Sequence, residues 1–172
     1  MSKPPKPITA QRLETIALAY LERFSASAAS LNRVLMRRVA RAEGEMEAGA
    51  RLVEALVERF LRSGLLDDRR YAEGKVASLH RRGASVLAIR HHLKERGVDA
   101  DLVEEALGAL AADLDGGSAD LAAATLYARR RRLGPFRPPT VRAVNRQRDL
   151  AALGRAGYSW DIARAVIDGE GE

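Results

Sequence analysis

The chain has 172 residues with a formal net charge of +6, and it contains no cysteine, which excludes disulfides, thiolate metal sites and cysteine nucleophiles. Hydrophobic residues make up 47% of the chain but aromatic residues only 5%, so its core consists mainly of Leu, Val, Ile and Ala, which favours helices. No stretch approaches the roughly 18 uninterrupted apolar residues of a membrane span, and the first residues lack the apolar core of a secretory signal. We therefore expect a cytoplasmic protein that does not associate with a membrane.

Residues 1–8 are rich in proline and are expected to form a disordered leader. Three helices are predicted over residues 9–66, because apolar residues recur there every three or four positions, which places them on one helix face. The first of these apolar stripes is Leu13, Ile16, Ala17, Tyr20, Leu21 and Phe24. Thr9 and Ser27 are placed to cap the first two helices, and residues 44–49 are predicted as a polar loop before the third.

A second group of three helices is predicted over residues 67–112. Asp67, Ser85 and Asp99 precede its three apolar stripes and are the expected helix caps. The residues expected to face its core include Val76, Ile89, Leu93, Leu102 and Leu107.

Residues 113–118, with the sequence DLDGGS, are predicted to form a flexible linker to a third group of helices. The third group is expected over residues 119–168, with a proline-broken turn at 134–139 and Ser159 as the cap of the last helix. Residues 169–172 are expected to form a short tail.

One segment of the chain occurs twice: residues 93–107 match residues 153–167 at a constant offset of 60. In both copies a leucine closes one helix, a glycine four residues later supplies a left-handed turn, and a capping residue starts the next helix. The first group lacks a glycine after its second helix and is interpreted as a divergent copy. We therefore predict an all-α protein of nine helices without a sheet, built from three-helix units in tandem.

No pattern in the sequence is typical of a catalytic or metal site. His91 and His92 are adjacent, so on a helix they point about 100° apart and cannot share a metal ion. His80 has no histidine or cysteine at ligand spacing, and all three histidines are interpreted as solvent-facing polar residues. Asp67 and Asp68 are interpreted as helix-start residues rather than an acid–base pair. We expect no catalytic residue, no metal and no cofactor.

The basic residues are almost all arginine and are unevenly distributed. Residues 1–66 carry 11 basic and 7 acidic side chains, residues 67–117 carry 8 and 10, and residues 118–172 carry 10 and 6. GC-rich codon usage also enriches arginine, and composition does not separate that origin from a functional one. A helix end explains one or two consecutive cations but not four. The residues predicted to contact a partner are Arg81, Arg82, Arg90, Arg129, Arg130, Arg131, Arg132, Arg142 and Arg146.

Four segments together resemble the RecX regulatory proteins: SAASLNRVL (27–35), GLLDDRRYAE (64–73), IRHHLKERGVD (89–99) and RAGYSWDIARAVI (155–167). The resemblance implies three tandem three-helix repeats in an elongated, curved array. It also implies that the chain binds the RecA recombinase or the RecA–DNA filament. Members of that family usually inhibit the ATPase, strand-exchange and co-protease activities of RecA in DNA repair and the SOS response. A monomer without enzymatic activity of its own is expected.

The sequence departs from the family pattern at Ser30, Val34, Ala84, Ser85 and His92. These positions put the detailed contact surface in question rather than the fold. The alternative function is a nucleic-acid-binding protein that contacts DNA through its terminal basic helices, and weak DNA binding is expected in either case. Aromatic platforms for single strands are scarce, since Tyr158 and Trp160 are interpreted as packing residues of a helix corner.

Overall fold

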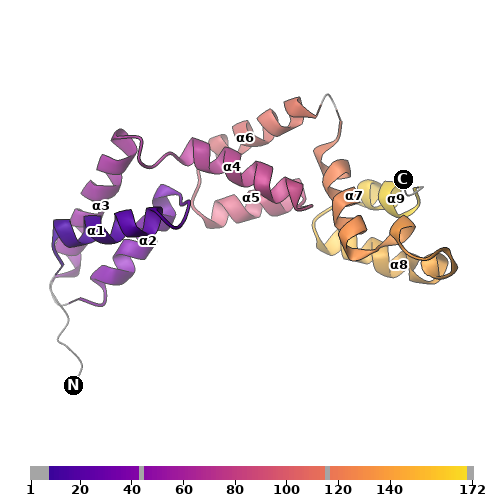
Figure 1. The fold of residues 1–172 in the computed structure, drawn as a ribbon, viewed down its shortest axis with the longest axis horizontal. Coiled ribbons are helices and arrows are strands. Elements are labelled where there is room, and N and C mark those ends of the chain that lie inside the picture. The colour runs from indigo at the N-terminus through magenta and orange to yellow at the C-terminus, as the bar shows by residue number, and fades with distance from the viewer. Residues whose placement is uncertain (1–7, 43–44, 115–116, 170–172) are drawn as a thin grey trace, which may run out of the picture. The chain divides into compact units, whose positions relative to one another are not determined.

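The computed structural model describes residues 8–42, 45–114 and 117–169. Within these ranges the chain forms nine α-helices and one short 3-10 helix, and no strand (Figure 1). The elements are α1 (Ala10–Leu21), α2 (Ala28–Val39), α3 (Met46–Arg62), α4 (Asp68–Arg81), α5 (Val86–Glu95), α6 (Ala100–Asp113), α7 (Ala119–Arg131), η1 (Gly134–Phe136), α8 (Pro139–Arg155) and α9 (Trp160–Ile167). The prediction of an all-α fold is confirmed.

The six predicted helix caps are all confirmed. Each side-chain oxygen accepts a hydrogen bond from a backbone N–H in the first turn of its helix, which satisfies a donor that the helix itself leaves unpaired. The six residues are Thr9, Ser27, Asp67, Ser85, Asp99 and Ser159.

The chain divides into two compact units, which are described separately. The first unit comprises Met1–Tyr71 and Arg96–Val98, and the second comprises Ala72–Glu95 and Asp99–Glu172. The predicted repeat boundaries stay a prediction. Most of the predicted leader and tail, and part of the predicted linker, lie outside the described residues.

The core of the first unit is built from the three predicted apolar stripes. Its buried members are Leu13, Ala17, Leu31, Leu35, Val39, Val53, Leu56, Val57, Phe60 and Leu66. Phe24 was expected among them but is 54% exposed, because α1 ends at Leu21 and the helical spacing stops there. Residues 46–49 were expected in a loop but form the first turn of α3. There Gly49 packs against the Val39 side chain so closely that a Cβ would collide with it.

In the second unit the predicted inward faces of α6 and α9 are confirmed in part. The buried residues are Val103, Ala106 and Leu107 in α6, and Ala163, Val166 and Ile167 in α9. Of these, Val103, Ala106, Leu107 and Val166 were expected in the core. Leu102 and Ile162 were expected there too but are only half-buried, because each lies one position before the buried stripe, about 100° around the helix.

The start of α2 is held by a polar contact that we call the first latch (Ser27, Ala28, Asp68, Arg96 and Gly97). The Ser27 hydroxyl donates to the carbonyl oxygen of Arg96 at 2.6 Å, and the Ala28 N–H donates to the Asp68 carboxylate at 2.8 Å. Gly97 approaches so closely that a Cβ would lie 2.5 Å from the Cβ of Ala29. Asp68, expected as a helix-start residue, therefore also binds the start of α2.

The second unit contains the same arrangement at the start of α5, which we call the second latch (Ser85, Val86, Asp120, Ala156 and Gly157). The Ser85 hydroxyl donates to the carbonyl oxygen of Ala156, and the Val86 N–H donates to the Asp120 carboxylate, both at 2.8 Å. A Cβ on Gly157 would lie 2.6 Å from the Ser85 Oγ. The segment that occurs twice in the sequence therefore supplies the same part of each latch, namely the accepting carbonyl oxygen and the glycine after it.

Among the described residues, the first and last groups of helices each lack one part of a further latch. The first turn of α1 has no acidic residue, and α2 is followed by Ala40 rather than by glycine. The N-cap of α8 is Pro138, which has no hydroxyl to donate. The missing glycine of the first group, noted in the sequence, thus corresponds to the absence of the carbonyl-and-glycine part of a latch after α2.

Replacing Gly157 by Ala is expected to lower the free energy of unfolding by about 1–2 kcal/mol. The backbone φ at Gly157 is +92°, where a side chain is strained, and the new methyl group would displace the Ser85 hydroxyl. Gly154, one turn earlier in α8, is exposed and has open space around it, so Gly154→Ala should raise stability by up to about 1 kcal/mol. Urea unfolding compares the two, and a shift of the same sign in both would contradict the second latch.

Candidate functional site

Two of the arginines predicted to contact a partner are already neutralised by carboxylates. Both guanidinium groups make two hydrogen bonds, Arg90 to Glu104 at 2.7 and 2.8 Å and Arg146 to Asp168 at 2.7 and 2.7 Å. The hydrogen bond from each arginine lowers the pKa of its carboxylate partner, so both pairs are ionised at neutral pH. Arg90 and Arg146 are therefore weaker candidates than the sequence indicated.

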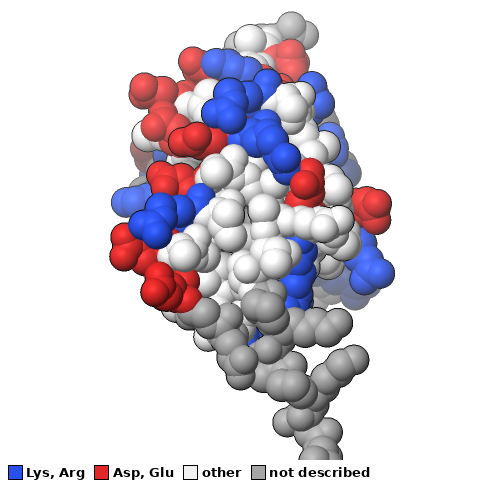
Figure 2. Space-filling view, turned by 90° about the vertical axis from the view of Figure 1, so that its left-hand side faces the viewer, with Lys and Arg blue, Asp and Glu red and all other residues white. Residues whose placement is uncertain are grey.

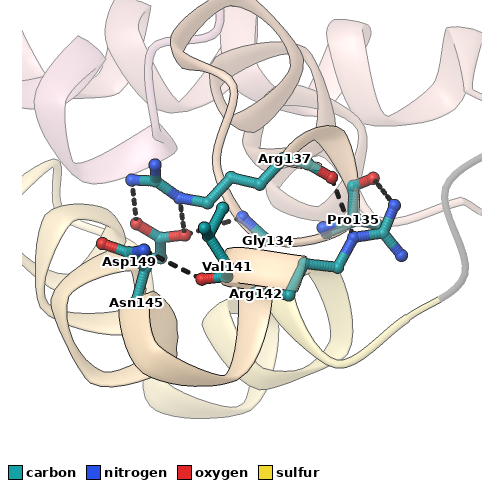
Figure 3. Close-up of polar contacts among 7 residues, drawn as sticks. All are labelled: Gly134, Pro135, Arg137, Val141, Arg142, Asn145 and Asp149. Atoms are coloured by element: carbon teal, nitrogen blue, oxygen red, sulfur yellow. Dashed lines mark hydrogen bonds and ion pairs between the residues drawn. The ribbon is translucent and has the colours of Figure 1, made fainter. Parts of the chain in front are cut away.

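Arg142 is also occupied, because it binds the segment between α7 and α8. Its guanidinium donates to the carbonyl oxygens of Arg137 at 2.9 Å and Pro135 at 2.6 Å (Figure 3). These bonds replace N–H donors that Pro135 and Pro138 in the segment and Pro139 at the start of α8 lack. The role of Arg142 is structural in this arrangement.

The same segment is anchored by Asp149, a residue that sequence reasoning did not single out. Its fully buried carboxylate accepts hydrogen bonds from Arg137, at 2.6 and 2.7 Å, and from the N–H of Gly134 at 2.8 Å (Figure 3). Burial acts to raise the pKa of Asp149, but the bonds from Arg137 and Gly134 outweigh it and the pKa is lowered. No sequence pattern distinguishes this aspartate from a solvent-facing one.

Three other arginines surround a hollow of about 430 Å³ in the second unit. We call it the arginine hollow, and its lining residues are Arg82, Gly83, Ala84, Ala88, Tyr127, Arg130, Arg131 and Ala156. In the part of the chain that the structure describes, none of the three arginines pairs with a carboxylate. The hollow therefore combines exposed positive charge with a small, mostly apolar floor.

The hollow exists because α7 crosses directly over the corner between α4 and α5. A Cβ on Gly83 would lie 2.9 Å from the Tyr127 backbone nitrogen, so only glycine permits this approach. Arg130 then reaches back across the corner, and its Nη1 donates to the Arg82 carbonyl oxygen at 2.9 Å. The guanidinium of Arg131 lies 4.9 Å from the centre of the Tyr127 ring, a cation–π distance.

Two buried polar side chains fix the corner from the other side. The Tyr158 hydroxyl donates to the Gly83 carbonyl oxygen at 2.8 Å, and burial raises the pKa of Tyr158 so that it stays a donor. His80 was expected to face solvent but is 6% exposed, with its Nε2 2.8 Å from the Ala119 carbonyl oxygen. Tyr158 and Trp160 were both expected to pack in the α8–α9 corner; Tyr158 is buried there as expected, but Trp160 is 57% exposed.

The remaining predicted residues do not join one cluster. Arg81 is exposed at the end of α4. Arg129 lies over the Phe136 ring at 5.4 Å, and Arg132 adopts a left-handed backbone conformation at the end of α7 with φ 53°. The run of four arginines is thus divided, and only Arg130 and Arg131 line the hollow with Arg82.

The first unit has an excess of basic residues but does not gather them on the face that Figure 2 shows. Basic and acidic side chains alternate there around an uncharged area. Three arginines of this unit form exposed ion pairs with glutamates: Arg51–Glu47, Arg59–Glu14 and Arg62–Glu58. Such pairs offer little attraction to a charged partner.

The arginine hollow presents groups that are chemically suited to binding anionic oxygens. Guanidinium groups are permanently charged and match carboxylate or phosphate oxygens in two-pronged hydrogen bonds. Among the described residues no group of three or more His, Asp or Glu side chains could hold a metal ion. In the same residues no helix is long and apolar enough to cross a membrane.

Comparison with known proteins assigns the chain to a family. The family model for the second three-helix domain of RecX matches residues 67–107. A protein named "Regulatory protein RecX" from Myxococcus xanthus (strain DK1622) is 43% identical over 171 residues, which cover 96% of this chain and 89% of that protein. The chain belongs to the RecX family of regulatory proteins. A RecX protein from Thermobifida fusca (strain YX) is 32% identical and covers 91% of this chain and 77% of its own length.

Two crystal structures of RecX proteins share the fold at low sequence identity. One, titled as the regulatory protein RecX, has a TM-score of 0.65 at 19% identity and covers 93% of this chain and 72% of its own. The other, RecX from Lactobacillus salivarius, has a TM-score of 0.64 at 17% identity, with coverages of 92% and 94%. The RecX resemblance read from the four sequence segments is therefore confirmed.

Proposed function

We propose that this RecX protein binds the RecA–DNA filament and lowers the ATPase, strand-exchange and co-protease activities of RecA. Membership in a family of regulatory proteins supports a protein partner and a role that is not enzymatic. The observation that carries the proposal at the level of residues is the arginine hollow. Its three arginines lack carboxylate partners in the described chain, whereas Arg90 and Arg146 are paired.

The hollow suits acidic side chains of a protein partner. Arg82, Arg130 and Arg131 can each donate to a carboxylate, while Ala84 and Ala88 leave room for an apolar side chain beside it. A partially enclosed site strengthens such pairs because water screens them less. We place the protein in the cytoplasm, as a monomer without a cofactor, where RecA filaments form.

One observation favours the alternative of direct DNA binding. Trp160 is 57% exposed, so it could stack on an unpaired base, and it was not expected to be available. Its helix α9 belongs to the same unit as the arginine hollow. Weak DNA binding of this kind is compatible with binding to a filament that contains DNA.

Co-sedimentation separates the two functions. The protein is mixed with RecA alone, with single-stranded DNA alone, and with RecA–DNA filaments formed with ATP. We expect it to sediment with the filaments, to lower their ATP turnover, and to bind less tightly as salt rises from about 0.1 M to about 0.3 M. Equal binding to naked DNA without any effect on ATP turnover would favour the alternative. Failure to bind filaments at low salt would end the proposal.

A further inference from the structure

The second latch adjoins the arginine hollow. Ala156 belongs to both, because its carbonyl oxygen accepts a hydrogen bond from the Ser85 hydroxyl and the residue also lines the hollow. Asp120 lies in the first turn of α7, and Arg130 and Arg131 lie ten and eleven residues further along the same helix. Any contact that fixes the start of α7 therefore affects where these two guanidinium groups lie.

α7 meets the α4–α5 corner through the close approach of its backbone to Gly83 and through polar contacts near both of its ends. At its start, Asp120 accepts the Val86 N–H and the Ala119 carbonyl oxygen contacts His80. At its end, Arg130 donates to the Arg82 carbonyl oxygen. Without the Asp120 carboxylate, the start of α7 loses its bond to α5 but keeps its contact with His80, so its position over the corner is less constrained.

The first latch provides a comparison within the molecule. Asp68 occupies the place of Asp120, and its carboxylate accepts the Ala28 N–H at the same distance of 2.8 Å. Ten and eleven residues after Asp68, however, the chain has Ser78 and Leu79 instead of two arginines. The two latches thus share their geometry, but only the aspartate of the second latch is followed by arginines ten and eleven residues later.

We propose that Asp120 and Ser85 are positioning residues for partner binding: they hold α7 over the α4–α5 corner so that Arg82, Arg130 and Arg131 face one hollow. The proposal rests on the proposed function for its binding readout. Asp120 is the better residue to test, since Ser85→Ala would also remove the N-cap of α5. Asparagine at position 120 keeps an oxygen that accepts the Val86 N–H, whereas alanine removes it.

The test compares Asp120→Ala, Asp120→Asn and Asp68→Ala with the parent protein. Because the chain has no cysteine, Leu87→Cys and Leu126→Cys, both at exposed positions of α5 and α7, can carry two spin labels. We expect a narrow distance distribution in the parent, Asp120→Asn and Asp68→Ala, and a broad one in Asp120→Ala. In unlabelled proteins, we expect Asp120→Ala to bind RecA–DNA filaments about tenfold more weakly, because orientation is lost, and the other two to bind like the parent.

Three results would overturn the proposal. They are an unchanged distance distribution in Asp120→Ala, a broad distribution with parental affinity, and an equal loss of affinity in Asp68→Ala. If the parent protein itself does not bind filaments, the proposed function fails. The distance distributions then decide the positioning role by themselves, a broad one in Asp120→Ala supporting it and an unchanged one refuting it.

Discussion

Replacing Asp149 by Ala is expected to lower the free energy of unfolding by about 3 kcal/mol or more. The carboxylate is fully buried and is the common acceptor for Arg137 and the Gly134 N–H. Its removal leaves a largely buried guanidinium and a buried N–H without their partner, and unpaired buried donors are costly. The turn between α7 and α8 should loosen as well, because these bonds hold it.

A matched control is Asp168→Ala, which removes a carboxylate of the same kind from the surface. Asp168 also binds an arginine through two hydrogen bonds, but it is 38% exposed. Water replaces its partner, so the loss of stability should be a small fraction of that in Asp149→Ala. Chemical denaturation measures both, and similar losses would show that Asp149 does not anchor the turn.

Asp149 also makes the stability of the protein depend on pH. The pKa of Asp149 is lower in the folded protein than its ordinary value of about 3.9. Its contribution to stability is therefore complete above that ordinary value and is lost as pH falls through the lowered pKa. The parent should lose more stability than Asp149→Ala on acidification from about pH 5 to about pH 2. Parallel losses would contradict the assignment.

The helices and their caps could be predicted from the sequence because both are decided locally. A capping side chain binds an N–H within its own first turn, so residue type and position suffice, as at Thr9 and Ser159. The turns at Gly97 and Gly157 could be predicted from the repeat, because a glycine after a helix also acts locally. Phe24 and Leu102 were misplaced because the end of a helix and its exact rotation depend on what packs against it.

The polar contacts that hold the site could not be predicted, because their partners are distant in sequence. Asp68, His80 and Asp149 bind atoms 40, 39 and 12 to 15 residues away. From the sequence alone, a polar residue at each of these positions is predicted to be exposed to solvent. Spacing also could not tell which arginines are neutralised, since Glu104 lies 14 residues from Arg90 on the next helix.

The arginine hollow remains predictable only in part. The sequence located a run of four arginines, but the crossing of α7 over Gly83 decided that two of them join Arg82. Arg90, Arg142 and Arg146 looked equivalent in the sequence and are bound within the chain. The nine predicted contact residues stay a prediction, and Arg82, Arg130 and Arg131 form a group that can be tested together.

The affinity of the triple variant Arg82→Ala, Arg130→Ala and Arg131→Ala for RecA–DNA filaments tests the hollow most directly. Its control removes the same charge from three paired arginines, Arg59, Arg90 and Arg146. Both variants should fold, since exposed charges contribute little to stability. We expect the hollow variant to bind at least about tenfold more weakly, with a shallower salt dependence, and the control to bind like the parent. Parental affinity and parental inhibition of ATP turnover in the hollow variant would contradict the proposed surface.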